Sequence, residues 1–403
     1  MKNYFCFLQN KKSYLFLLIY LFLLLNSCGK GEGGRLKDTN KDDEEIMVDE
    51  ELLALPVRDI VSKLYPKNVY VGVANKADLI GELSTGIADR EFSYVTPAND
   101  FKQSYVVADL NKKPRWEKPD KYLTHAQEVG QVLRIHGPIS PQCSPWARED
   151  NRTKDEMNRM LNLYMQALCQ RYNGKDGVLW MDVVNETICP ENVKGGKKYP
   201  DMVPGDWFGP RDGTDKWENP WTILGYDEES GLRVPLYIDK AFEIANKYAP
   251  DIKQIINQHG KFEEVVWEKM KRLVRYLREE RGRRVDGIGW QAHIDMGWEK
   301  EEGNLERLDS FIKWCHANEL EFHITEMNVW MKDVVDEDVQ ADTFGKVLEV
   351  LLKNRKTGVV GINYWNVRDE DTSNAEWQGT IWRNDGTPRK AYERIKKELI
   401  ANY

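Results

Sequence analysis

The chain has 403 residues and a formal net charge of −8 at neutral pH. That length is too great for a small disulfide-stabilised scaffold and suits either one large barrel or two domains. No block of basic residues stands out, which argues against nucleic acid or an anionic membrane surface as a partner. A neutral polymer fits this charge better.

The N-terminus has the pattern of an export signal. Lys2, Lys11 and Lys12 precede an apolar run over residues 13–25, which is shorter than the roughly 20 residues of a membrane-spanning helix and typical of a secretory signal. The run ends in LNSC, which resembles the lipobox of bacterial lipoproteins, and this resemblance implies lipidation of Cys28. We therefore expect residues 1–27 to be removed and the mature protein to be lipid-anchored to the bacterial (outer) membrane, in the periplasm or at the cell surface. An uncleaved anchor helix is the alternative, and it also places the protein outside the cytoplasm.

Residues 28–51 are charged and rich in glycine, with almost no apolar residue. This composition predicts a flexible tether. The remainder, residues 52–403, is predicted to form the folded domain.

Short apolar runs alternate with segments of helical period along this domain. Eight runs have the length and composition of buried strands, at residues 68–74, 92–99, 131–137, 177–186, 253–258, 285–294, 321–329 and 359–367. Apolar residues spaced three and four apart predict helices over 155–170, 237–248, 265–277, 305–315 and 344–352, with a last helix over 388–400. Eight apolar strands alternating with helices are typical of a single (β/α)8 TIM barrel in the α/β class. A doubly wound open sheet has the same periodicity, but the chain lacks the glycine-rich motifs of nucleotide-binding sheets.

One connection is much longer than the others. Residues 187–220 contain five prolines and show neither helical nor strand period. A loop of this length within a compact domain is usually functional or disordered. Trp207, Phe208 and Trp217 favour a functional role.

Four cysteines remain outside the N-terminal segment. No CxxC pair occurs, which argues against a zinc site. Cys169 and Cys315 lie on apolar helix faces and are predicted core residues. Cys143 and Cys189 both follow strand ends, so a disulfide between neighbouring loops stays open.

Two glutamates end apolar strands. Glu186 closes the run LWMDVVNE, and Glu326 lies near the end of the run FHITEMNVW. In a parallel barrel, polar residues at the C-terminal ends of strands face the mouth, so both side chains are expected in one cleft. Two carboxylates that flank a bond are what glycoside hydrolysis requires. The alternative is that each glutamate is a surface residue or an ion-pair partner.

Three motifs sharpen this interpretation. WMDVVNE, GIGWQAHI and ITEMN occur in this order and resemble the WDVVNE, GIGxQxH and ITExD motifs of the xylanases of glycoside hydrolase family 10, which lie on strands four, six and seven of a (β/α)8 barrel. The segments FSYVTPANDFK, LRIH and NDGTPRKAYERI resemble further motifs of that family. The resemblance covers about residues 52–400.

The resemblance implies a retaining, double-displacement mechanism. Glu186 would be the general acid/base and Glu326 the nucleophile. Asn185 would hold the 2-hydroxyl of the attacked sugar, His293 would orient Glu326, and Gln291 would line the same strand end.

A second group of residues would bind sugar, again by resemblance. Asn99, Lys102 and His136 would bind on the non-reducing side of the scissile bond. Trp365 would stack under the reacting ring, and Trp377 is a candidate second platform. Gln142 is matched to a family glutamine. Trp180, Trp267 and Trp314 lie in regular elements and are predicted core residues.

The sequence departs from the family pattern at four places, one beside His293 and three in the sugar-binding walls. Asn328 replaces an aspartate and offers His293 only a neutral hydrogen bond, so we expect a shifted pH profile. The strand-three motif continues as HGPISPQCSPW, Ala98 replaces a glutamate, and the loop over 365–377 lacks the usual DxxSW.

We therefore expect an endo-acting retaining hydrolase that cleaves internal β-1,4-xylosidic bonds of xylan, with a preference for decorated xylan as a further hypothesis. The mechanism requires no metal or cofactor, and a monomer is the default. Two alternatives stay open, namely a surface glycan-binding lipoprotein without catalysis and the same hydrolysis on another β-linked glycan.

Overall fold

The computed structural model describes residues 49–107, 111–141, 143, 153–190, 193–194, 197–198, 203–209 and 219–403. The predicted signal peptide, Cys28, most of the predicted tether, Gln142 and Trp217 lie outside the described residues. Residues Ile46–Tyr403 form one compact unit. None of the helices described in it is long and apolar enough to cross a bilayer.

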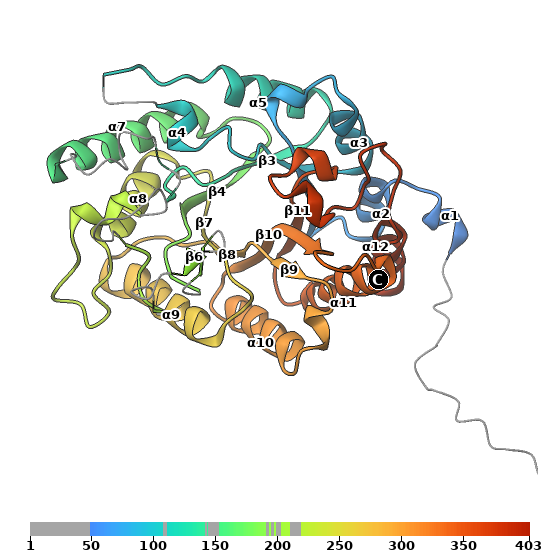
Figure 1. Ribbon diagram of the computed structural model, residues 1–403. Coiled ribbons are helices and arrows are strands. Elements are labelled where there is room, and N and C mark those ends of the chain that lie inside the picture. Colours follow the sequence, from blue (N-terminus) through green and yellow to red (C-terminus); the bar gives the residue numbers. More distant parts are fainter. Residues whose placement is uncertain are drawn as a thin grey trace, which may run out of the picture. The chain divides into compact units, whose positions relative to one another are not determined.

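Parallel strands form a closed barrel at the centre of this unit, and helices surround it (Figure 1). The barrel strands are β1 (Val69–Ala74), β2 (Tyr94–Thr96), β3 (Val132–Ile135), β4 (Val178–Asn185), β7 (Lys253–Gln258), β8 (Gly287–Trp290), β10 (Glu321–Trp330) and β11 (Val360–Tyr364). They pair in chain order, and β11 pairs in parallel with both β10 and β1. Because the first and last strands pair, the sheet has no free edge, as a (β/α)8 barrel requires. The predicted fold is confirmed, and the open sheet is excluded.

The sixth predicted strand is divided into two pieces. β8 ends at Trp290, and a separate strand, β9 (His293–Asp295), pairs with β10 alone. Between them Ala292 has a positive φ of 57°, a conformation that a β-strand cannot include. The divided strand carries Gln291 and His293, which are both predicted site residues.

All six predicted helices are present. They are α7 (Lys154–Tyr172), α8 (Leu236–Tyr248), α9 (Glu264–Arg275), α10 (Asn304–Ala317), α11 (Glu337–Asn354) and α12 (Lys390–Ala401), with α9 continuing into a π-helical turn, η3 (Tyr276–Glu280). The longest, α7, begins with a capping box in which the Thr153 side chain accepts from the Glu156 backbone and Glu156 reaches back to Thr153. Its apolar stripe, which includes Met157, Leu161 and Leu168, is buried against the barrel as its period predicted.

Several shorter elements were not predicted. The helices among them are α1 (Glu50–Leu53), α2 (Val57–Leu64), α3 (Leu83–Glu91), α4 (Gln103–Val106) and α5 (Glu117–Glu128). Short 3-10 turns are η1 (Ala77–Leu79), η2 (Pro220–Leu224), η4 (Trp298–Lys300), η5 (Asp369–Asp371) and η6 (Ala375–Trp377). α1 begins one residue before the predicted end of the tether, because the Asp49 side chain caps its first turn.

The long connection after β4 contains some regular structure. β5 (Val193–Lys194) and β6 (Lys197–Lys198) form an antiparallel pair. This hairpin was not predicted, because strands of two residues are too short for a hydrophobic period to appear. Phe208, one of the aromatic residues taken to favour a functional role, is only 1% exposed and packs with Cys189, so it is a core residue.

The four described cysteines are buried thiols, and the bridge between Cys143 and Cys189 is not formed. Cys169 and Cys315 belong to the core as predicted. Trp180 and Trp267 are also buried, whereas Trp314 is only partly buried at the edge of the core.

Candidate active site

Glu186 comes directly after β4 at the mouth of the barrel. Its backbone N–H donates to the carbonyl of Asn257 on β7, 3.0 Å away, and its φ is +58°. A non-glycine residue in this left-handed region is uncommon and often marks a functional position. The side chain is half-buried, and its Oε1 accepts hydrogen bonds from Asn185 Nδ2 at 3.2 Å and Gln291 Nε2 at 3.1 Å.

Glu326 lies within β10 and is 4% exposed. Its Oε1 accepts a hydrogen bond of 2.8 Å from Asn257 Nδ2 and lies 3.7 Å from His136 Nε2. Its Oε2 lies 3.4 Å from His293 Nε2. The carboxylate is therefore enclosed by nitrogen atoms from three other strands.

Amide side chains connect the two glutamates. Asn185 Oδ1 accepts from both Asn257 Nδ2 at 2.9 Å and Gln291 Nε2 at 3.2 Å. Asn257 also donates to Glu326, and Gln291 also donates to Glu186. Both carboxylates thus belong to one hydrogen-bonded network at the C-terminal ends of β4, β7, β8 and β10.

Asn257 was missed in the sequence, although it holds the centre of this network. Its Oδ1 accepts from the Thr325 hydroxyl at 2.7 Å, which fixes the orientation of the amide. Gly289 makes room for it, because a Cβ there would lie 2.5 Å from Asn257 Oδ1. The signal available in the sequence was the polar end of the strand KQIINQ.

The surroundings of Glu326 favour its ionised form. Burial alone would raise the pKa of this carboxyl group. His136, His293 and Lys102 act against burial, through their charges and the contact with His293, and hold the pKa below its usual value. The balance of these effects favours the ionised form of Glu326 although the side chain is buried.

His136 is oriented by an ion pair inside the barrel. Its Nδ1 lies 2.9 Å from Asp182 Oδ2, and Asp182 Oδ1 accepts from Arg134 Nε at 2.8 Å and Arg134 Nη2 at 2.6 Å. Burial would raise the pKa of Asp182, but Arg134 and His136 hold it below its ordinary value. The ionised Asp182 accepts the Nδ1 proton, which directs His136 Nε2 toward Glu326. Asp182 and Arg134 were also missed in the sequence, because barrel-interior polar residues look like any other polar residue in an apolar strand.

His293 faces a hydrogen-bond acceptor at each ring nitrogen. Its Nδ1 lies 3.1 Å from Asn328 Oδ1, and its Nε2 faces Glu326. The Asn328 amide orientation is fixed, because its Nδ2 donates to the backbone carbonyls of Trp365 at 2.9 Å and Gly379 at 3.4 Å. A neutral imidazole carries one N–H, so only the imidazolium can donate at both contacts.

The remaining predicted site residues are placed as follows. Lys102 is buried next to Gly137. A Cβ added at Gly137 would lie 3.3 Å from Lys102 Cε and 3.7 Å from the Cβ of Asn185, so both side chains lie beside this glycine. Asn99 is half-buried in the turn after β2, and its carbonyl accepts from the Lys102 backbone at 2.9 Å. Trp365 is half-buried, with its ring edge-on to His136 at 5.2 Å between centroids.

Trp377 lies in an aromatic group beside the network. Its ring contacts Trp330 at 4.8 Å between centroids, and the Trp330 ring stacks parallel to His293 at 5.7 Å. Lys332 Nζ lies over both indoles, at 4.6 Å from Trp330 and 4.9 Å from Trp377. Trp330 was not predicted as a site residue, because it is the last residue of an apolar strand and such residues are usually part of the core.

Among the described residues, no group of three or more His, Cys, Asp or Glu side chains is arranged so that it could hold a metal ion. Amides, histidines and carboxylates at the mouth of a barrel, with aromatic rings beside them, can bind a neutral sugar and transfer protons to it.

The sequence matches the model of Glycosyl hydrolase family 10 over residues 61–398. The chain belongs to this family. Endo-1,4-beta-xylanase A of Caldicellulosiruptor saccharolyticus is 25% identical over 363 residues, which cover 83% of this chain and 94% of that protein. Endo-1,4-beta-xylanase A of Thermotoga neapolitana is 24% identical over 360 residues, which cover 85% of this chain but 30% of that protein. The chain therefore spans less than a third of the length of this second relative.

Solved structures share the fold of this family 10 member. Native xylanase 10B from Thermotoga maritima matches with a TM-score of 0.65 at 22% identity, covering 86% of this chain and 98% of that one. Xylanase 10B from Thermotoga petrophila RKU-1, solved in complex with xylobiose, matches with a TM-score of 0.67 at 22% identity, covering 86% and 97%. At this identity the likeness establishes the (β/α)8 barrel.

The environment of Glu326 makes a prediction about its titration. Replacing His293 with glutamine removes a group that lowers the pKa of Glu326 through its charge and its contact, so this pKa should rise. The measurement is a carbon-13 titration of labelled glutamate carboxyl groups, with the resonance assigned through Glu326→Gln. His125→Gln is the matched control, because His125 pairs with Asp89 elsewhere in the fold. An unchanged Glu326 titration in His293→Gln would show that His293 does not stabilise the carboxylate.

The two donor bonds of Asn328 make a second prediction. Asn328→Asp keeps an acceptor for His293 but loses both bonds to backbone carbonyls, so the free energy of unfolding should fall by roughly 1–3 kcal/mol. Urea denaturation at neutral pH measures this loss. Asn374→Asp is the control, because it introduces the same charge nearby where no side-chain donor bond exists among the described residues. Equal stability of the two variants would contradict the assigned amide role.

Proposed function

We propose that this family 10 member is an endo-acting, retaining endo-1,4-β-xylanase, with Glu326 as the nucleophile and Glu186 as the general acid/base. The observation that carries the proposal is the amide network that joins the two carboxylates, in which Glu326 is buried among His136, His293 and Lys102. A nucleophile must be ionised, and the direction of the Glu326 pKa meets this need. Glu186 is more exposed, as suits a group that exchanges protons with a leaving oxygen and with water.

The reaction proceeds in two displacements. Glu186 gives its proton to the glycosidic oxygen while a Glu326 oxygen attacks the anomeric carbon, so that the sugar–oxygen bond breaks and a glycosyl ester forms. Glu186, now ionised, takes a proton from water as the water oxygen attacks the same carbon. The ester bond then breaks and returns Glu326 as a carboxylate. After the first displacement neither glutamate carries a proton, because Glu186 is a carboxylate and Glu326 an ester, and the second displacement returns one proton to Glu186.

Asn185 is assigned to the 2-hydroxyl of the attacked sugar. Its Oδ1 is saturated by Asn257 and Gln291, so its orientation is fixed before substrate arrives. Its Nδ2 is the atom left to donate outward, and it now contacts Glu186 and the Ser140 hydroxyl. Such preorganised donors strengthen as charge develops in the transition state.

Xylan is the proposed substrate because the relatives matched by the sequence carry the name endo-1,4-beta-xylanase. The residue types agree with a neutral, unbranched sugar backbone. Trp365 and Trp377 present aromatic rings for the apolar faces of the sugars, and Asn99, Lys102 and His136 supply hydrogen bonds to hydroxyl groups. His136 is suited to this task, because its buried Nε2 has no hydrogen-bond partner among the described residues.

Carboxylate variants test the proposal. Glu326→Ala and Glu186→Ala should each lower the release of reducing sugar from xylan by at least about 10³-fold, since each removes a group on which bond cleavage depends. Glu321→Gln is the matched control on the same strand. Glu321 accepts from Trp180 and His323 away from the network, so this variant should retain activity. Xylan binding by the wild type without any release of sugar would identify a glycan-binding protein instead.

The stereochemistry of the first product tests the assignment of roles. Proton NMR of a xylo-oligosaccharide digest should show the β-anomer first, with the α-anomer appearing only by mutarotation. The α-anomer as the initial product would exclude a glycosyl ester on Glu326. The same experiment on other β-linked glycans decides whether the backbone must be xylan.

We further propose export and lipid anchoring at Cys28, on the strength of the basic, apolar and LNSC segments of the N-terminus. Labelling of the expressed protein with radioactive palmitate should be lost in Cys28→Ala and kept in Cys6→Ala. Label that persists in Cys28→Ala would overturn this assignment.

A further inference from the structure

A pocket of about 390 Å³ lies beside helix α9, outside the amide network. Its walls are α9, the segment over 203–209 and the loop around Leu232. Gly205 allows the first two walls to pack closely, because a Cβ at this position would lie only 2.5 Å from a methyl carbon of Val265 on α9. Its volume falls in the range of small-molecule sites and exceeds what a simple inorganic anion needs.

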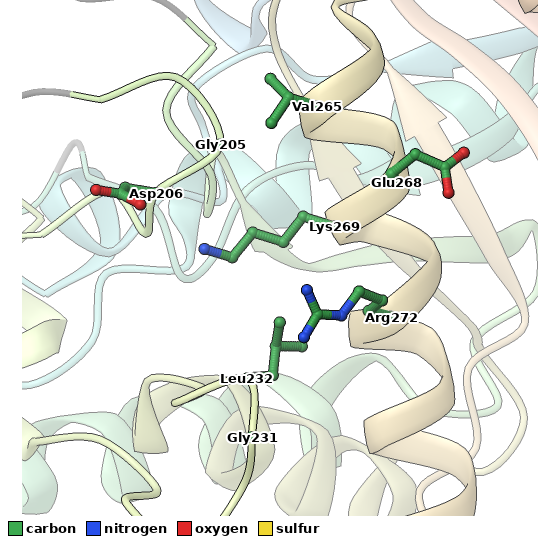
Figure 2. A pocket seen from close by; sticks show the side chains of 8 residues that line it. All are labelled: Gly205, Asp206, Gly231, Leu232, Val265, Glu268, Lys269 and Arg272. Carbon is green, nitrogen blue, oxygen red and sulfur yellow. The ribbon is translucent and has the colours of Figure 1, made fainter.

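Two cations point into this pocket. Figure 2 shows that Lys269 and Arg272 extend from α9 toward the opposite walls, where Asp206 lies, while the carboxylate of Glu268 points away. Glu268 instead pairs with Lys271 on α9 at 2.6 Å. Neither Lys269 nor Arg272 forms an ion pair with any residue that the structure describes. The interior of the pocket is therefore positive in a protein that is acidic overall.

Lys269 is placed by an aromatic ring. Its Nζ lies 4.2 Å from the centre of the Trp207 ring, and Trp207 Nε1 donates to the Leu232 carbonyl at 3.0 Å. Burial lowers the pKa of Lys269 to about 8, with Asp206 acting in the opposite direction. Asp206 offsets the cost of burying this cation only in part, because the Lys269 pKa stays below its ordinary value, so an anion that enters the pocket would relieve the remaining cost.

The pocket is connected to the proposed acid/base. Trp207 forms an antiparallel bridge with Ile188, two residues after Glu186. Phe208 N donates to the Thr187 carbonyl at 2.9 Å, and Cys189 N donates to the Asp206 carbonyl at 2.8 Å. The pocket wall is thus held by backbone hydrogen bonds to the segment that directly follows Glu186.

We propose that this pocket binds a carboxylate-bearing sugar, the uronic acid branch of a decorated xylan chain. The two cations would hold the carboxylate, Arg272 through its planar fork, and the side chains of Leu232 and Val265 would pack against the sugar ring. This inference rests on the proposed function for the substrate backbone, whereas the anionic sugar is assigned from the pocket itself. It gives the long connection after β4 a task in substrate selection.

Binding of free sugars tests the pocket without reference to catalysis. Glucuronate should shift the Trp207 indole N–H resonance in a titration of the full-length protein, whereas glucose should not. Lys269→Met and Arg272→Met should each weaken glucuronate binding by about tenfold, the weight of one charge-assisted hydrogen bond. Lys271→Met is the matched control, because it removes the same charge from the other face of α9. Equal binding by all variants, or equal shifts from glucose, would overturn the site. If inorganic phosphate binds as tightly as glucuronate, the assignment of a sugar ligand is wrong, and the pocket is a general anion site.

Hydrolysis tests the link to the substrate. The ratio of kcat/KM on glucuronic-acid-branched xylan to that on linear xylan should fall by about tenfold in Arg272→Met, with the linear value unchanged. A constant ratio would overturn the role in branch recognition while the xylanase proposal stands. If the wild type cleaves neither polymer, the proposed function fails, and glucuronate binding alone then identifies a uronate site unconnected with xylan.

The pH dependence gives an independent readout. The charged or titratable groups that act on Lys269 are Asp206, Arg272 and Cys189. Lys269 loses its proton above pH about 8, so glucuronate affinity should fall between pH 7 and 9 in the wild type. Lys269→Arg stays charged and should bind equally at both values. An equal fall in both proteins would remove Lys269 from the site.

Discussion

The structure depends on one costly arrangement, a carboxylate buried at the mouth of the barrel. Glu326 is almost inaccessible to solvent, and an isolated charge in such a place would take up a proton instead. Residues from four separate parts of the chain supply the compensation. Asn257 gives a hydrogen bond, His136 and His293 supply positive charge at either oxygen, and Lys102 adds charge from a longer distance. The barrel suits this task because its parallel strands bring side chains from distant parts of the chain to one rim.

Behind the mouth, the interior of the barrel is polar where it supports the site. Arg134 and Asp182 form a fully buried pair, and Asp182 turns His136 toward Glu326. A buried ion pair contributes little net stability, and its benefit is the fixed geometry of the groups around it. Arg134 holds Asp182, and Asp182 in turn orients His136 at the rim, while all three side chains stay buried.

The amide side chains act as neutral spacers between charged groups. Asn185, Gln291 and Asn257 separate Glu186 from Glu326 while holding both in position. Asn328 has a different task, since it joins β10 to the chain after β11 and to Gly379. An aspartate cannot donate those two bonds. Asn328 therefore supplies two bonds in this protein that an aspartate at the same position could not supply.

Much of this protein could be predicted from its sequence. Apolar runs of strand length between segments of helical period specified the (β/α)8 barrel, because burial on both faces leaves a direct mark on composition. The positions of Glu186 and Glu326 at strand ends were equally plain. The sequence could not reveal Asn257, Asp182 or Trp330, whose partners lie on other strands and whose importance arises only when the barrel closes. It left open a disulfide that the fold does not form, and it counted Phe208 among aromatic residues with a functional role, whereas packing buries this side chain. The local pattern thus determined which elements form, and tertiary structure alone decided which polar side chains meet, because hydrogen bonds between distant residues have no period along the chain.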